Sequence, residues 1–499
     1  MSRSTKIVLG LLAALVVGAV LVGGLLVTIR VLEILFDPRA VDPANVVVCR
    51  ESAGCAILHP IIFGLIFVFV LLTGFAYTTL LERKFIAWFQ QRVGPNRTGP
   101  QGLLQPLADA IKLIFKEDII PDQADKPVYY LAPLLKTIPV LMVVMVIPIG
   151  PDILLPWFDG LVYQVPLGIA DVNVGVLWLL GVTSLATYGV VLAGWSSNNK
   201  YAMLGGIRAS AQMISYELSL GLAMAVPVMI VGSMSIGDII NAQKNVWDWL
   251  VFQNPLAAAI LVLTLFAEVS RAPFDLTEAE QELTAGFMTE YSGMKFAAFM
   301  MAEYVGMIAV GMIVSSMFFG GYHLIPVDNA PLLGPIFMIG KVVLFLIFFI
   351  WVRSTLPRIR YDRLMAFGWK VLLPLAILAV AWTAVSVVIG EESGSPFAYG
   401  LASAVFFVLV VGFGVVFLRR SGEQEQPAEP DLASDPIITG ERRGAGAIAL
   451  TILGGLIAIP FAIINGLASY LEQVAENSQG PVPSSDETAI TTTESAGGD

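Results

Sequence analysis

Residues 255–293 read PLAAAILVLTLFAEVSRAPFDLTEAEQELTAGFMTEYSG, and this stretch decides the class of fold. Its first half is apolar enough to cross a bilayer as a helix, and a second apolar run follows at about 296–319. Between the two runs the chain carries a dense row of acids with one base before its end. Carboxylates so close to lipid are costly and suggest a function.

The composition of the whole chain extends this pattern. Of 499 residues, 57% are hydrophobic and 13% are charged, whereas soluble domains carry about 25% charged residues. Long apolar runs without strand-like alternation satisfy their backbone hydrogen bonds in lipid only as helices. The sequence therefore predicts an all-α fold, a polytopic transmembrane helix bundle.

Several function classes are excluded by the residue inventory. Two His and two Cys cannot supply a dedicated His/Cys metal site, paired-His haem ligation or a four-Cys iron–sulfur cluster. No GxxxxGK[ST] or GxGxxG loop follows a strand, and no basic run indicates nucleic acid. If the chain takes part in redox chemistry, the electrons belong to another subunit or to a diffusible substrate.

Eleven candidate spans follow from the apolar runs. They cover about residues 7–35, 60–82, 130–150, 172–195, 210–232, 255–271, 296–319, 335–353, 369–390, 399–418 and 446–466. The first could also be a signal peptide, because Arg3 and Lys6 precede it. Its length and the lack of a small-residue cleavage site favour a retained span.

The distribution of basic residues predicts the orientation. Most of the 28 Lys and Arg lie in the N-terminus and in the loops after the even-numbered spans. The opposite side holds Arg30, Arg39, Arg50 and Lys244. By the positive-inside rule the N-terminus and the acidic stretch face the cytoplasm. We expect a multi-pass protein of a bacterial plasma membrane, although physics alone does not exclude an organellar one.

The exported loop 36–59 contains Cys49 and Cys55. An oxidising compartment permits a disulfide between them. Two free thiols are equally consistent with the sequence.

The longest cytoplasmic loop, 82–118, contains a second helical pattern. Gly94-Pro95-Asn96 and Gly99-Pro100 break any helix, and the pattern resumes from residue 102. Leu103, Leu107, Ala110, Ile111 and Ile114 then share one face, and Gln105, Asp109, Lys112 and Lys116 lie opposite. This spacing predicts an amphipathic helix in the membrane interface, near the basic residues Arg83, Lys84, Arg92 and Arg97. Simple anchoring of the topology is the alternative explanation of those basic residues.

Charged residues also occur inside the apolar runs. Glu217, Glu268 and Glu303 are the acids, and Lys136 and Lys341 are the bases. One such residue could belong to a structural ion pair. Several that converge in one half of the membrane indicate a proton or ion path, because carboxyl groups in a low dielectric exchange protons near neutral pH.

The acids of the opening stretch complete this set. Glu278, Glu280 and Glu282 alternate along the chain and cannot share one helical face. They suit a loop folded over a polar cavity, in which neighbouring carboxyl groups share protons. A solvated acidic loop is the alternative.

Four stretches together resemble one known family. ERKFIAWFQQRVGPNRTGP (82–100), AGWSSNNKYAMLGGIRASAQMISYE (193–217), EVSRAPFDLTEAEQELTAGFMTEYSGMKF (268–296) and WVRSTLPRIRYDRLMAFGWK (351–370) look like the quinone-tunnel membrane subunit of respiratory NADH:quinone oxidoreductase, complex I. The resemblance covers about residues 58–390 and eight spans. It implies a component that forms the quinone access tunnel and begins the carboxylate proton path that couples quinone reduction to proton translocation.

The resemblance assigns roles to matching positions. The implied tunnel and junction residues are Arg83, Lys84, Arg92, Asp109, Lys112, Arg358 and Arg360. The implied proton path comprises Glu217, Glu268, Asp275, Glu278, Glu280, Glu282 and Glu303, with Arg271 as counter-ion. The quinone is the substrate, and this chain binds no metal or cofactor of its own. Flavin and iron–sulfur clusters are expected on partner subunits, alongside small membrane subunits and antiporter-like subunits.

The parts outside the resemblance define the domain organisation. Residues 1–57 form an extra N-terminal span and exported loop before the core at 58–390. Residues 391–466 add two spans around a polar linker at 421–443, and residues 467–499 read as a disordered acidic tail.

Three other functions compete with this interpretation. One is the equivalent subunit of a related complex with another electron donor, of deazaflavin, ferredoxin or hydrogenase type. A stand-alone ion transporter lacks support, because no internal repeat is visible. A purely structural anchor would have no reason to carry charged groups within its spans.

Overall fold

The computed structural model describes residues 46–156, 162–275, 286–324, 327, 330–394, 399–410 and 412. Within these ranges, seven helices are long and apolar enough to cross a membrane. They are α2 (Ala53–Phe89), α4 (Lys126–Met145), α5 (Gly175–Ser196), α6 (Lys200–Val231), α10 (Gly293–Phe318), α11 (Leu333–Thr355) and the continuous run Tyr361–Ser393. The predicted polytopic helix bundle is confirmed.

The remaining helices are shorter. Two of them are apolar, α9 (Pro255–Glu268) and Tyr399–Val410. The run at 361–393 consists of α12 (Tyr361–Phe367), a π-helical turn at Gly368–Leu372 and α13 (Leu373–Ser393). The short helices α3 (Gln105–Ile114), α7 (Ile236–Asn241) and α8 (Leu250–Gln253) lie in connections. The predicted spans at 7–35 and 446–466 lie outside the described residues.

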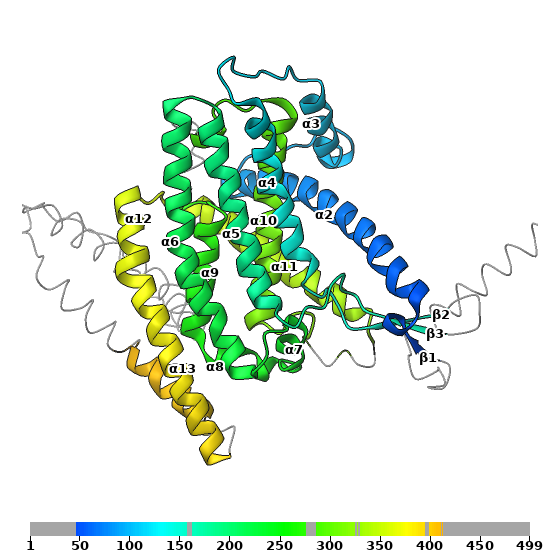
Figure 1. Cartoon of the computed structure of the whole chain (residues 1–499), viewed down its shortest axis with the longest axis vertical. Coiled ribbons are helices and arrows are strands. Elements are labelled where there is room, and N and C mark those ends of the chain that lie inside the picture. The colour runs from blue at the N-terminus through cyan, green and yellow to red at the C-terminus, as the bar shows by residue number, and fades with distance from the viewer. Residues whose placement is uncertain are drawn as a thin grey trace, which may run out of the picture. The chain divides into compact units, whose positions relative to one another are not determined.

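The bundle is arranged around α10 (Figure 1). In the most apolar stretch of α10, 78% of the residues are buried, whereas in that of α2 only 11% are buried. Helices α4, α11 and α2 contact α10, α5 joins α4 to α6, and α6 packs on α9 and α13. Helix α10 is therefore the central helix of the bundle, and α2 lies at the edge of the bundle.

The chain divides into two compact units. The described residues up to 359 together with those of 368–407 form the first unit, which holds nearly all the groups discussed below. The segment Arg360–Phe367 belongs to the second unit and is described by itself.

Helix α6 begins ten residues before the predicted span at 210. Its N-cap is Asn199, whose side chain accepts a hydrogen bond from Tyr201 N at 2.9 Å. The Gly205-Gly206 pair, which reads as a loop signal, lies inside the helix because the chain packs closely there. A Cβ at Gly205 would lie 2.6 Å from the backbone of Gly286. Tertiary packing therefore overrides the weak helix propensity of glycine at this point.

A small sheet that the sequence did not predict lies at one end of α2 (Figure 1). Strand β3 (Val162–Val165) pairs in parallel with β1 (Val46–Val48) and antiparallel with β2 (Ile153–Pro156). Directly after β1, Cys49 is joined to Cys55 by a disulfide. The segment before α2 and the connection between α4 and α5 thus meet in one sheet.

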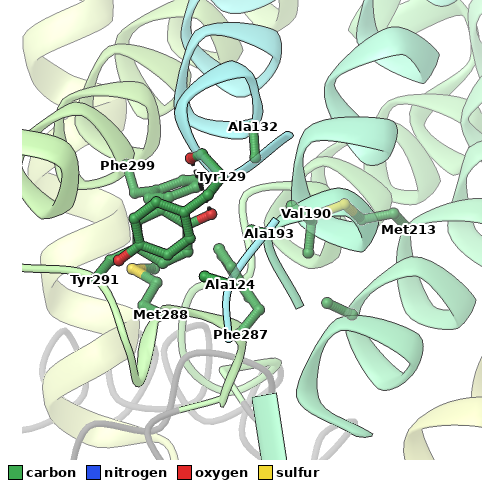
Figure 2. Close-up of a cluster of buried hydrophobic side chains, with 11 residues drawn as sticks. Ala124, Tyr129, Ala132, Val190, Ala193, Met213, Phe287, Met288, Tyr291 and Phe299 are labelled. Carbon is green, nitrogen blue, oxygen red and sulfur yellow. Dashed lines mark hydrogen bonds between the residues drawn. The ribbon is translucent and has the colours of Figure 1, made fainter. Parts of the chain in front are cut away.

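A buried aromatic cluster lies at the other end of the bundle, between α4, α5 and the start of α10 (Figure 2). The rings of Tyr129 and Tyr291 stack with centroids 4.2 Å apart, and Phe299 packs edge-on against Tyr291. The Tyr129 hydroxyl donates to the backbone oxygen of Glu290 at 2.6 Å, and the Tyr291 hydroxyl donates to that of Tyr129 at 3.2 Å. These contacts fix the chain immediately after the acidic stretch onto α4.

Candidate functional site

A buried ion cluster is built around Arg271, whose side chain is 7% exposed. Its Nη1 lies 3.1 Å from Glu82 Oε1, and its Nε lies 2.5 Å from Glu303 Oε1. Arg353 also pairs with Glu82 Oε1. The Arg271 guanidinium stacks over the ring of Tyr304, 4.5 Å from its centroid. Two acids and two bases therefore balance in one group, in which Arg271, Glu82 and Glu303 are buried and Arg353 is 34% exposed.

Four different elements supply this ion cluster. Glu82 comes from α2, Arg271 from the turn after α9, Glu303 from α10 and Arg353 from α11. Burying an ionised group costs several kcal/mol unless it is paired with good geometry. The cluster is therefore a point at which the positions of four elements depend on one another.

A second ion pair lies further along the same turn. Arg358 Nη2 is 3.3 Å from Asp275 Oδ2, and Ile359 N donates to the Pro273 carbonyl at 3.1 Å. Burial raises the pKa of the Asp275 carboxyl to about 6, because Arg358 offsets the desolvation only in part. Asp275 is thus half protonated near pH 6, at the point where the acidic loop begins.

A cavity of about 60 Å³ lies next to the ion cluster. Glu303, Glu268 and Lys136 line it from α10, α9 and α4, and its remaining walls are mostly apolar. The volume is sufficient for water, which needs polar partners of this kind. Because Glu303 also binds Arg271, the ion cluster and the cavity share a side chain.

Glu217 is not one of the residues that line this cavity, but it contacts a neighbour of one of them. The Ser184 hydroxyl donates a hydrogen bond to Glu217 Oε1, across the contact between α5 and α6. The neighbouring residue, Thr183, lines the cavity. The structure therefore brings Glu217, Glu268 and Glu303 into one region, together with Arg271.

A separate pocket of about 450 Å³ lies at the end of α2. Its walls include the basic side chains of Lys84 and Arg92 and the aromatic rings of Phe85 and Trp88. Lys84 Nζ donates to the Gln101 carbonyl at 2.7 Å, and Trp88 is 76% exposed. The pocket offers a ligand both apolar surface and two cationic groups.

The amphipathic helix α3 begins at Gln105, later than the predicted residue 102, because Pro100–Gly102 forms a 3-10 turn. Arg83 Nη1 lies 2.7 Å from Asp109 Oδ2, and Lys112 Nζ lies 3.4 Å from Asp109 Oδ1. Burial raises the pKa of the Asp109 carboxyl, but the hydrogen bond and charge of Arg83 outweigh it, so the pKa lies below its ordinary value. The apolar side chains of α3 are exposed: Leu107, Ile111 and Ile114.

Not every predicted site residue joins these groups. Arg360 pairs with its neighbour Asp362 at 3.1 Å, and both side chains are exposed. Glu278, Glu280 and Glu282 lie outside the described residues. Lys341, grouped in the sequence with the other intramembrane charges, donates instead to the carbonyls of Phe319, Gly321 and His323, past the end of α10 remote from the ion cluster.

Glu82 and Arg353 are the members of the ion cluster that sequence reasoning missed. Glu82 directly precedes Arg83 and Lys84 at the edge of a predicted span, a position typical of topology anchors. The one signal in the sequence was that Glu82 is an acid next to two bases, at the end of an apolar run. Only the packing of α2 against α10 and α11 shows that Glu82 points inward to Arg271.

Comparisons with known proteins agree with one another. A family model described as NADH dehydrogenase matches residues 62–384. An NADH-quinone oxidoreductase H-type subunit of Geobacter metallireducens is 50% identical over 327 residues, which are 65% of this chain and 95% of that protein. The corresponding protein of Protochlamydia amoebophila is 50% identical over 62% of this chain and 92% of its own length. That of Dehalococcoides mccartyi is 44% identical over 72% of this chain and 95% of its own.

Proposed function

The chain belongs to the NADH dehydrogenase family that includes the H-type subunit of NADH-quinone oxidoreductase, and on this premise we propose that it forms the quinone passage and the start of the proton path in such a complex. It is a multi-pass membrane protein. One observation supports the proposal above the others. Glu303 both pairs with Arg271 and lines the cavity that Glu268 and Lys136 share.

The pocket at the end of α2 supports the quinone part of the proposal. Its volume of about 450 Å³ suits a small-molecule site. Phe85 and Trp88 can stack on the quinone ring or its isoprenoid tail, and Lys84 and Arg92 can bind its carbonyl oxygens. The exposed apolar face of α3 beside α2 suits contact with lipid, from which a quinone would enter.

The electrons come from elsewhere in this proposal. Two electrons and two protons together convert the quinone into a quinol. NADH, flavin and iron–sulfur clusters belong to peripheral-arm subunits, and small membrane subunits and antiporter-like subunits complete the complex. This chain binds the quinone and holds in place the groups that respond to the change in its charge.

The ion pairs suggest how that response travels. Asp275 is held by Arg358 and titrates near pH 6, so a charge change nearby alters its protonation. Arg271 lies a few residues before Asp275. A change of charge at Asp275 then alters the strength of the two ion pairs that Arg271 makes, with Glu82 and with Glu303. Glu303 lies on the cavity, where Glu268 and, through the α5–α6 contact, Glu217 are the next acids. By the positive-inside rule the α3 end of the bundle faces the cytoplasm.

Glu303→Gln tests this proposal directly. The amide keeps the shape of the side chain but cannot carry the proton. Arg271 keeps its pair with Glu82, and the positive charge left unbalanced can reside on Arg353, which is 34% exposed. We therefore expect the complex to assemble and proton pumping to fall at least tenfold. Glu391→Gln, the same change at an exposed site at the end of α13, is the matched control. Inverted membrane vesicles would report NADH oxidation with decylubiquinone as acceptor, and acidification by quenching of a dye. Full pumping per NADH in assembled Glu303→Gln would refute the path.

Asp275→Asn should change the pH dependence. The folded pKa of about 6 lies above the ordinary value of about 3.9. Between these values the folded protein binds the extra proton, so the contribution of Asp275 to stability falls as the pH rises through this window. Asparagine removes both this decline and the inflection that we expect near pH 6 in quinone turnover.

The measurement for Asp275→Asn is turnover against pH from 5 to 8 in membranes, with thermal inactivation at each pH. Asp152→Asn, which alters a carboxylate bound by Gln164 beside β2, should keep the wild-type profile. An unchanged inflection in Asp275→Asn would assign it to another group.

A further inference from the structure

Gln212 lies on α6 and its side chain is fully buried. Its Nε2 donates two hydrogen bonds to backbone carbonyls, to Ala267 at 2.9 Å and to Phe274 at 3.0 Å. Both protons of the amide nitrogen are therefore used. A buried amide bound in this way fixes two points of another chain segment onto one helix.

The two carbonyls stand at particular positions in the sequence. The Ala267 carbonyl directly precedes Glu268, and the Phe274 carbonyl directly precedes Asp275. Arg271 lies between them. One side chain thus holds both ends of the segment 267–274, which carries Glu268 and Arg271 and ends directly before Asp275.

The contacts of Arg271 depend on where this segment lies. Its ion pairs with Glu303 at 2.5 Å and Glu82 at 3.1 Å run to two other helices. Charge-assisted contacts are short and directional, so a displacement of about 1 Å weakens them strongly. Tyr216, one turn further along α6, packs on the ring of Phe274, but ring packing tolerates sliding more than a hydrogen bond does.

We propose that Gln212 is a positioning residue for the proton path, which sets the spacing of Glu268, Arg271 and Asp275 without handling protons or quinone itself. The inference rests on the function proposed for those groups. Without the two donors, the carbonyls of Ala267 and Phe274 lose partners in a buried place, the segment shifts, and Arg271 no longer meets both of its acids.

Two substitutions remove the hydrogen-bond donors of Gln212 to different extents. Gln212→Met keeps the length of the side chain and supplies no donor. Gln212→Glu supplies at most one donor, when it is protonated. We expect turnover and protons pumped per assembled complex to fall in the order wild type, Gln212→Glu, Gln212→Met, with at least a tenfold loss in the last.

Gln243→Met is the matched control. Gln243 is also fully buried, and its Nε2 donates to backbone carbonyls, those of Ile239 and Ser316, while its Oε1 accepts from Gly320 N. It lies next to α7, at the end of α10 remote from the ion cluster. We expect Gln243→Met to lower thermal stability but to leave turnover per complex and its pH profile unchanged.

The readout that separates positioning from stability is the pH profile. Membranes with equal complex content on native gels would be assayed with NADH and decylubiquinone from pH 5 to 8. We expect a displaced inflection in both Gln212 variants. Wild-type turnover and profile in assembled Gln212→Met would overturn the inference, and if that variant fails to assemble, the same result in Gln212→Glu would overturn it.

Variants of Glu303 and Glu217 distinguish a failure of this inference from a failure of the proposed function. If Glu303→Gln and Glu217→Gln retain full pumping, the proton path itself is wrong. If they lose pumping while both Gln212 variants retain it, only the positioning role of Gln212 is wrong.

Discussion

Arg271→Met should remove most of the assembled protein from the membrane. The substitution leaves Glu303 and Glu82 with only Arg353 to balance them, in a group that is almost wholly buried. An uncompensated buried charge costs about 3–5 kcal/mol. Since whole domains are stable by about 5–15 kcal/mol, this loss is large. Native gels of solubilised membranes would measure the amount of complex.

A double variant separates charge balance from function. Arg271→Met with Glu303→Gln removes one charge of each sign, so we expect assembly to recover while proton pumping stays low. Arg360→Met, which removes an arginine from an exposed ion pair worth about 0–1 kcal/mol, should assemble like the wild type. Normal assembly of the Arg271→Met single variant would contradict the role of the ion cluster.

Gly189→Ala has the second largest expected effect. A Cβ at this position on α5 would lie 2.6 Å from the backbone nitrogen of Lys136 and 3.0 Å from the carbonyl oxygen of Ala132, both on α4. Backbone atoms cannot rotate away, so α4 and α5 must separate. We expect a loss of about 3 kcal/mol, at the upper end of ordinary overpacking, and displacement of Lys136 from the cavity.

Gly181→Ala is the control for Gly189→Ala in the same helix. Nothing lies within 4 Å of a Cβ at Gly181. Alanine there should be neutral or stabilise the helix by up to about 1 kcal/mol. The comparison uses the midpoint of thermal inactivation and the complex content. Equal behaviour of the two variants would show that the α4–α5 contact is looser than the backbone distances imply.

The helices of the bundle were predictable because lipid permits few solutions. Seven predicted spans coincide with helices long enough to cross a membrane, and the one at 255–271 coincides with the shorter helix α9, since an apolar run must satisfy its backbone internally. Helix α6 begins ten residues before the predicted span, and the close packing of Gly205 in this extension depends on residue 286, far along the chain. The sheet was missed because strands of three or four residues carry almost no pattern of their own.

The residues of the site also comprise some that the sequence predicts and some that only the packing of the helices reveals. Glu217, Glu268 and Glu303 stand out in the sequence because charges within apolar runs are rare. Their neighbours depend on packing: Glu82 reads as an anchor until α2 lies against α10 and α11. Lys341 belongs to the same rare class but binds carbonyls remote from the ion cluster. Sequence finds the charged residues of such a site, and tertiary structure decides which of them meet.

The small sheet imposes an order on biosynthesis. Strand β1 pairs with β3, and Val46 meets Val162, more than a hundred residues later. At translation rates of roughly 5–20 residues per second, β1 waits on the order of ten seconds before its partner leaves the ribosome. By then α2, α3 and α4 have all been synthesised. Strand β3 therefore pairs with β1 only after the helices that lie between them in the chain have been made, and the ribosome sets the earliest moment at which the end of α2 beside β1 can take its final position.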